Sequence, residues 1–137
     1  MKTSYELRLK SKLTEVRRVE KFVKKLAAQH HFSEARLHDV MLVITEATNN
    51  AILHGNKLDA KKRATLRCTV DGNRLLVEVH DEGNGFDPDA LPNPLAEENL
   101  LKPSGRGVFL IKQLAEDVRY EFSKTGTTVR FAITFRN

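Results

Sequence analysis

Two neighbouring runs of alternating residues constrain the fold of this chain more than any other feature. Residues 63–70 alternate strictly between apolar and polar side chains, and residues 74–80 form a second, more hydrophobic run. Asp71-Gly72-Asn73 separates them and is typical of a tight turn. Because successive side chains of a strand point to opposite faces, the pattern predicts an antiparallel hairpin with one face on a core. Cys68 lies on the apolar face and is predicted to be a small core residue, not a nucleophile.

The other elements are predicted from the same kind of periodicity. Tyr5, Leu7 and Leu9 alternate with charged residues, which predicts a strand near the N-terminus. Helical spacing predicts an amphipathic helix over residues 14–29, with Thr14 as its cap. Further predicted elements are a helix from the cap Ser33 to Gly55 in a C-cap role, a long loop at 81–103 with a helical turn at 95–101, a helix from Gly105, and strands at 118–122 and 129–135.

The order of these elements predicts an α+β fold. Strands joined by hairpins pair antiparallel, and helices grouped between them cover one face of the resulting sheet. We therefore expect a two-layer α/β sandwich with a mixed, mostly antiparallel sheet and its helices on one face. A chain of 137 residues is expected to form a single domain.

Composition indicates an ordinary globular chain, with 40% hydrophobic and 30% charged residues. No run of about 18 apolar residues is present, and the N-terminus lacks the apolar segment of a signal peptide. The single cysteine excludes an internal disulfide, so a cytoplasmic location is expected. The net charge of +5 suggests nucleic acid, but the cations are interspersed with acids and no aromatic residues interleave with them. Ordinary surface charge is therefore the preferred interpretation, and a basic surface would equally suit an acidic protein partner or help to attract a nucleotide.

Three polar residues on the second predicted helix indicate phosphate chemistry. Glu46, Asn50 and His54 are spaced four residues apart, so at about 100° per residue they lie on one helical face. Mg²⁺ prefers oxygen ligands, which makes Asn50 a candidate ligand. Glu46 is a candidate acceptor for the proton of a hydroxyl, and Asn49 and His54 complete the surroundings. An ordinary solvated helix face would carry the same residue types, and the spacing alone leaves both interpretations open.

Asp81 opens a glycine cluster, Asp81-Glu82-Gly83-Asn84-Gly85, at the end of a predicted strand. A carboxylate there can accept a hydrogen bond from an exocyclic amine such as that of adenine. Gly83 and Gly85 lack Cβ and allow the backbone to approach a flat ring closely. Near the C-terminus, the hydroxyl of Thr127 is placed to bond the base or a bridging water. Taken singly, either segment is equally typical of an ordinary turn.

A second glycine cluster, Gly105-Arg106-Gly107, begins a predicted helix. The N-terminus of a helix presents free N–H groups and a partial positive charge, which suit phosphate. Lys102 and Arg106 flank this segment and are candidate phosphate contacts, although both are also compatible with plain surface charge. The cluster matches neither the Walker pattern nor the dinucleotide fingerprint.

In this order and spacing, the four elements resemble the N, G1, G2 and G3 boxes of the GHKL ATPase and kinase superfamily. The small size and the wording of residues 46–55 and 105–111 resemble the bacterial anti-sigma-factor serine/threonine kinases in particular. The resemblance covers nearly the whole chain. It implies a Bergerat ATP-binding fold over residues 1–137, with ATP and Mg²⁺ as ligands and a lid at residues 86–104.

The resemblance also implies a role for individual residues. Glu46 is the general base, Asn50 binds Mg²⁺ and Asp81 holds the adenine amine. The remaining candidate nucleotide-binding residues are Gly83, Gly85, Lys102, Gly105, Arg106, Gly107, Val108 and Thr127. Val108 stands where many members have leucine, and the lid arginine that some of them use is not assigned.

Proteins of this type phosphorylate a serine or threonine of a small STAS anti-anti-sigma protein and bind a sigma factor or another regulator. An ATP-gated binding module without turnover is the main alternative. A detached histidine-kinase domain would use the His38-Asp39 pair, and a nucleic-acid binder would rest on charge alone. An exposed first strand would allow pairing across a homodimer.

Overall fold

The computed structural model describes residues 2–83 and 103–136, and only the backbone of residues 103–108. Its helices and strands follow one another in the order expected from the sequence. They are β1 (Lys2–Lys10), η1 (Leu13–Glu15), α1 (Val16–His30), α2 (Glu34–Asn50), η2 (Ala51–Gly55), β2 (Arg63–Asp71), β3 (Arg74–Asp81), α4 (Pro103–Leu114), β4 (Glu116–Ser123) and β5 (Gly126–Thr134).

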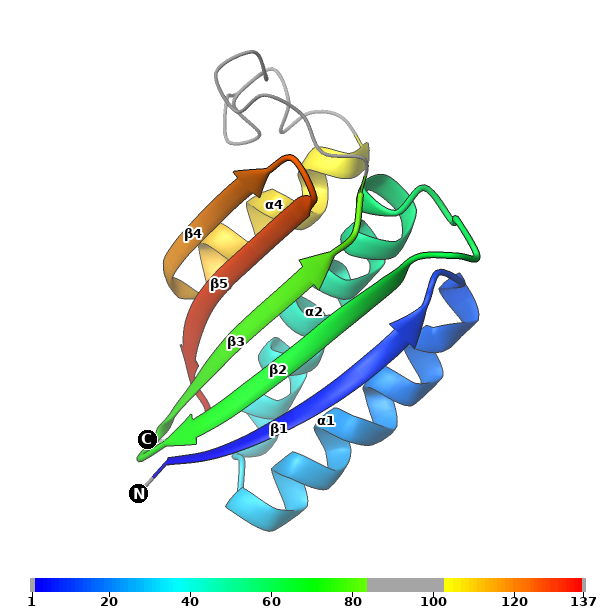
Figure 1. The fold of residues 1–137 in the computed structure, drawn as a ribbon. Coiled ribbons are helices and arrows are strands. Elements are labelled where there is room, and N and C mark those ends of the chain that lie inside the picture. The colour runs from blue at the N-terminus through cyan, green and yellow to red at the C-terminus, as the bar shows by residue number, and fades with distance from the viewer. Residues whose placement is uncertain (1, 84–102, 137) are drawn as a thin grey trace.

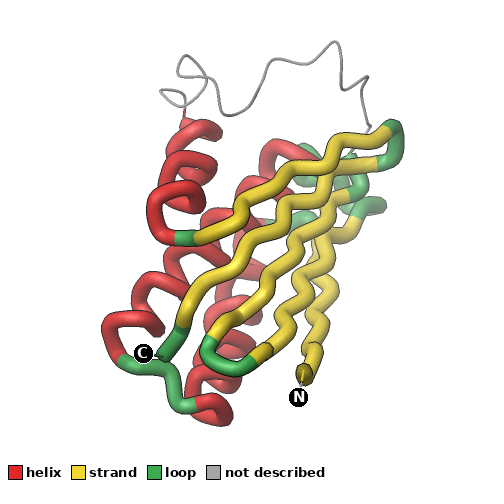
Figure 2. The backbone as a smooth tube through the Cα atoms, turned by 90° about the vertical axis from the view of Figure 1, so that its left-hand side faces the viewer, coloured by secondary structure: helices red, strands yellow, loops and turns green. Residues whose placement is uncertain are grey.

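The described strands form one sheet in the order β1-β2-β3-β5-β4. The helices cover one face of this sheet, and α2 lies between α1 and α4 and contacts both (Figure 1). Figure 2 shows the two layers from the side. The predicted two-layer α+β sandwich is thereby confirmed. Its four strand pairings are all antiparallel, so the described sheet is antiparallel throughout rather than mixed.

The core lies between the sheet and the helices. The predicted hairpin pairs β2 with β3 in antiparallel register, and Leu66, Cys68 and Leu75 are fully buried on its inner face. Helix α2 contributes Val40 and Ile44 to the same core. Each of the buried leucine, valine and isoleucine side chains contributes about 1.5–3 kcal/mol on burial. Burial also raises the pKa of the Cys68 thiol to about 12, which agrees with its prediction as an unreactive core residue.

One predicted helix start was wrong, and another lies within one turn of its predicted position. Thr14 does not cap α1, because it lies within the short helix η1, and no side chain caps the first turn of either element. Helix α4 begins at Pro103 rather than at Gly105, and proline is well suited to a first helical turn because its missing N–H is not needed there. Ser33 caps α2 as predicted, since its hydroxyl accepts a hydrogen bond from the Arg36 amide.

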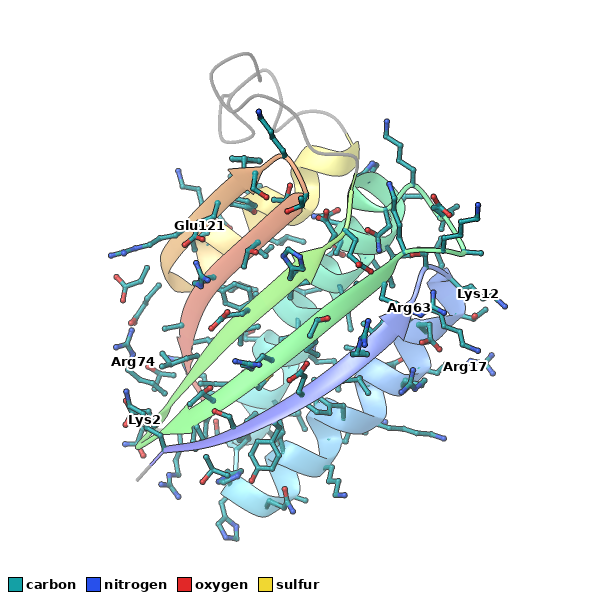
Figure 3. The ribbon with its side chains drawn as sticks, in the orientation of Figure 1. Lys2, Lys12, Arg17, Arg63, Arg74 and Glu121 are labelled. Carbon is teal, nitrogen blue, oxygen red and sulfur yellow. The ribbon has the colours of Figure 1, made fainter. Side chains whose placement is uncertain are left out.

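The face of the sheet opposite the helices carries paired charges. Arg130 of β5 forms ion pairs with Glu78 and Glu121, and Arg67 of β2 pairs with Glu6 at 3.1 Å. Arg74, at the start of β3, pairs with Asp117 and Glu116 of the edge strand β4, and Figure 3 labels it. Many arginines behind the net charge of +5 are therefore matched by acids. None of the described helices is both long and apolar enough to cross a bilayer.

Candidate functional site

The predicted motifs come together at one end of the molecule. The end of β3, the end of α2, the start of α4 and the start of β5 all lie there (Figure 1). Asp81 and Thr127, which are 46 residues apart, are direct cross-strand partners in the β3–β5 pairing. The antiparallel pairing of these two strands therefore brings the glycine cluster that begins at Asp81 next to the segment that contains Thr127.

Asp81 is a buried carboxyl group held by main-chain donors. Asp81 is the last residue of β3 and is only 5% exposed. The amides of Gly83 and Thr127 donate hydrogen bonds to its Oδ1, at 3.0 and 3.3 Å. Burial raises the pKa of Asp81, although these two hydrogen bonds lower it in part. A buried carboxylate oxygen of this kind is suited to accept a hydrogen bond from a ligand whose binding excludes water from the site.

Two glycines allow the chain to pack directly against Asp81. A Cβ at Gly55 would lie 2.2 Å from Oδ2 of Asp81, and a Cβ at Gly83 would lie 2.6 Å from the carbonyl oxygen of Gly55. Both distances are shorter than a side-chain carbon tolerates, so the end of α2 approaches the end of β3 only because both residues lack Cβ. The reason for glycine at position 55 is thus contact with Asp81.

The predicted C-cap role of Gly55 was wrong. Gly55 ends the π-helical segment η2 without positive φ, and the left-handed residues come later, at Lys57 and Leu58. The π turn is closed by a hydrogen bond from the Asn56 amide to the Ala51 carbonyl at 2.8 Å. Short π segments within helices often occur at functional sites, and this one immediately follows Asn50.

The catalytic candidates lie on the last turns of α2. Glu46 and Asn50 are half-buried, one turn apart, whereas His54 is exposed within η2. The side-chain oxygen of Asn49 is buried and receives no hydrogen bond in the described part of the chain. An unpaired buried acceptor of this kind carries a free-energy cost of about 1–3 kcal/mol, which a donor on a ligand would relieve.

The remaining candidates are only partly described. Gly105, Arg106, Gly107 and Val108 lie in the first two turns of α4, where the backbone alone is described. Gly85 and Lys102, together with the predicted lid up to residue 102 and the predicted helical turn at 95–101, lie outside the described residues. The last two residues of the predicted lid, 103 and 104, belong to α4.

One buried residue at this end of the molecule was missed in the sequence. Asn56 follows Gly55 and is 1% exposed, and its side chain bonds both Ser11 and the main chain of Glu82. Its partners come from segments far away in sequence. Asparagine in a polar stretch after a helix is also typical of an exposed turn, so no local pattern marks its burial.

Residues 9–133 match the model of the histidine kinase-like ATPase domain family. Among curated proteins, the chain is 29% identical over 110 residues to the serine-protein kinase RsbW of Bacillus subtilis, covering 76% of this chain and 68% of that protein. It is also 29% identical over 97 residues to the anti-sigma F factor of the same organism, covering 69% of this chain and 66% of that protein.

A solved structure containing the RsbU and RsbW domains of a Mycobacterium tuberculosis protein has a TM-score of 0.71 with this chain at 17% identity. The match covers 96% of this chain but only 32% of that longer chain, and it shows a shared fold.

The antiparallel sheet, the helical layer and the motifs gathered at one end define an ATP-binding domain of the GHKL type. This chain belongs to the histidine kinase-like ATPase domain family. The predicted resemblance is confirmed, since its curated relatives include serine-protein kinases and an anti-sigma factor.

Proposed function

We propose that this protein is an ATP-dependent serine/threonine protein kinase of the anti-sigma-factor type. The observation that carries the proposal is the buried Asp81 carboxyl, gathered with the Glu46–Asn50 turn at one end of a domain of this family. The names of two relatives, a serine-protein kinase and an anti-sigma factor, support the same proposal.

The residues at this end fit an adenine nucleotide. The Asp81 carboxylate offers a buried acceptor for the exocyclic amine of adenine, and its position is fixed by the Gly83 and Thr127 amides. Thr127, the cross-strand partner of Asp81, would support the base through its half-buried side chain. Gly83 and Gly85 would shape the pocket by leaving room for the ring.

Phosphates and Mg²⁺ would be held on the helical side of the pocket. Gly105, in the first turn of α4, would offer a free main-chain amide to phosphate oxygens, and Gly107, Lys102, Arg106 and Val108 would lie beside them. Asn50 would ligate Mg²⁺, which neutralises phosphate charge when bound. The unpaired buried oxygen of Asn49 supports a polar ligand here, because a metal-bound water would supply the missing donor.

Glu46 would act as the general base. Its carboxylate would take the proton of the attacking serine or threonine hydroxyl, as the hydroxyl oxygen bonds to the terminal phosphorus and ADP leaves. Glu46 is half-buried and lies one helical turn before Asn50, so the proposed base and the proposed metal ligand would share the same stretch of α2.

The partners would be a small STAS anti-anti-sigma protein as the phosphate acceptor, and a sigma factor or similar regulator as the bound target, in the cytoplasm. A homodimer would form through β1, which is an edge strand of the sheet. This pairing would use the first half of the strand, because side chains of η1 and α1 already bond its second half at Arg8 and Lys10.

The experiment is to incubate the protein with Mg-ATP and a STAS domain from the same genome, and to map phosphorylated residues by mass spectrometry. The proposal expects one phosphoserine or phosphothreonine on the STAS domain, which appears only with ATP. ATP-dependent partner binding without any phosphate transfer would contradict the kinase and would identify an ATP-gated binding module instead.

A further inference from the structure

Asn56 uses every polar group it has, although it is almost completely buried. Its main-chain amide donates to the Ala51 carbonyl at 2.8 Å. Its side-chain Nδ2 donates to Oγ of Ser11 at 3.0 Å, and its Oδ1 accepts the main-chain amide of Glu82 at 2.8 Å. The residue is 1% exposed. A buried amide with donor and acceptor both satisfied fixes the groups around it more strictly than an apolar contact would.

The bonds of Asn56 continue into two further segments. Ser11 is 3% exposed and donates from Oγ to the carbonyl of Lys62 at 2.7 Å. Glu82 is held a second time, because its Oε1 accepts the main-chain amide of Arg63 at 2.6 Å. Figure 3 shows Arg63 at this corner of the molecule, near the end of β1. Through these bonds the end of α2 is joined to the end of β1, the start of β2 and the end of β3.

The network acts on the peptide that follows Asp81. Asn56 holds the Glu82 amide, and the next residue, Gly83, donates its own amide to the Asp81 carboxylate. Gly55, the residue before Asn56, lies against the other oxygen of that carboxylate. Asn56 therefore fixes both sides of Asp81: the helix end that contacts the carboxylate, and the turn that donates to it.

We infer that Asn56, supported by Ser11, is a positioning residue that sets the nucleotide preference of the Asp81 pocket. The inference rests on the proposed ATP site. Adenine presents an amine donor where guanine presents a carbonyl acceptor, so a carboxylate held in one place favours adenine and repels guanine. A carboxylate that shifts loses the bond to adenine and no longer excludes guanine as strongly.

The test compares the binding of Mg-ATP and Mg-GTP by titration calorimetry in the wild type, Asn56→Ala and Ser11→Ala. The ratio of the two dissociation constants is the readout. We expect the preference for ATP to fall about tenfold in Asn56→Ala, which loses two buried hydrogen bonds, and about threefold in Ser11→Ala, which loses the Asn56–Ser11 bond together with the one to Lys62.

Val70→Ala is the matched control for stability. Val70 is buried on β2 near the opposite end of the sheet, where it pairs with Leu75. The Val70→Ala variant loses core packing but leaves the hydrogen bonds of Asn56 and Ser11 in place. Its ratio of dissociation constants for ATP and GTP should therefore equal that of the wild type. All variants are compared at a temperature at which each is folded by circular dichroism.

The inference would be overturned if the ratio of the two dissociation constants in Asn56→Ala equals that in Val70→Ala. If Asn56→Ala does not fold, a ratio in Ser11→Ala equal to that of the wild type would overturn it instead. In either case the proposed kinase would stand, provided that the wild type binds ATP and Asp81→Asn does not. A wild type that binds neither nucleotide would overturn the proposed function, and this inference with it.

Discussion

Gly55 lies directly against the carboxyl group of Asp81, so closely that a Cβ on Gly55 would sit 2.2 Å from Oδ2. This contact joins the end of the α2–η2 helix to the end of β3. It connects the helix that carries Glu46 and Asn50 with the glycine cluster that begins at Asp81, and it explains why the residue after His54 has no side chain.

Gly55→Ala should therefore damage both stability and nucleotide binding. The added methyl group must displace the Asp81 carboxylate or the helix end, and overpacking of this kind costs about 1–3 kcal/mol. We expect a lower midpoint of urea unfolding and a loss of ATP binding. Gly72→Ala is the control, since it adds a methyl group into open space at a residue with φ of 62°. Its strain should lower stability and leave ATP affinity unchanged; an equal loss of affinity in both variants would argue against the contact.

Asp81→Asn should separate stability from binding. Burial raises the pKa of Asp81 in the folded state, so ionising this carboxyl group costs stability. Below the unfolded-state pKa of about 3.9 both proteins carry no charge at this position. As pH rises through the raised pKa, the wild type loses stability relative to Asp81→Asn. We expect the melting temperature of the variant, minus that of the wild type, to increase from acidic to neutral pH, while ATP binding is lost.

Asp71→Asn is the matched control for this pH series. Asp71 is an exposed carboxyl at the end of β2 that lies far from the candidate site, so Asp71→Asn reports the effect of removing a surface carboxylate over the same pH range. A flat profile for Asp81→Asn would contradict the buried, raised-pKa carboxyl.

Glu46→Gln should abolish phosphate transfer and leave ATP binding intact. The amide keeps the size of the side chain but cannot take the hydroxyl proton, and loss of a general base lowers rates by about 10²–10⁴-fold. Single-turnover transfer from ATP to the STAS partner measures this step. Glu34→Gln changes an exposed carboxylate in the first turn of the same helix, so it should transfer at the wild-type rate. Transfer by Glu46→Gln at that rate would remove Glu46 from the mechanism.

Removing the two side chains of η1 and α1 that bond the main chain of β1 should strengthen self-association. The Lys10 amide donates to the Glu15 carboxylate at 2.9 Å, and Arg18 donates to the Arg8 carbonyl at 3.1 Å. Both bonds occupy main-chain groups that an added strand would need. The double variant Glu15→Ala, Arg18→Ala should dimerise at lower concentration than the wild type in analytical ultracentrifugation. Unchanged or weaker association would show that pairing of β1 does not extend into its second half.

The sequence predicted the strands and most helices because their burial follows simple periods. Alternation located β2 and β3, and the turn between them set the register. The same reasoning placed Asp81 at a strand end and Thr127 near the start of another strand, and β3–β5 pairing brought the two together.

What the sequence did not predict depends on contacts between distant segments. Gly55 was interpreted as a helix cap because its local context fits one, whereas its partner is 26 residues away in β3. The π turn is likewise absent from the periodicity of α2, which continues without interruption to Asn50. Asn56 and Ser11 are 45 residues apart, and neither belongs to a motif, so only the fold reveals that they are buried together.

Titration calorimetry with Mg-ATP on the wild type and Asp81→Asn tests the nucleotide pocket most directly. We predict one binding site per chain for the wild type and no measurable heat for the variant, whose stability is intact. Absence of binding to the wild type, or equal affinity in the two proteins, would contradict an adenine pocket built on Asp81.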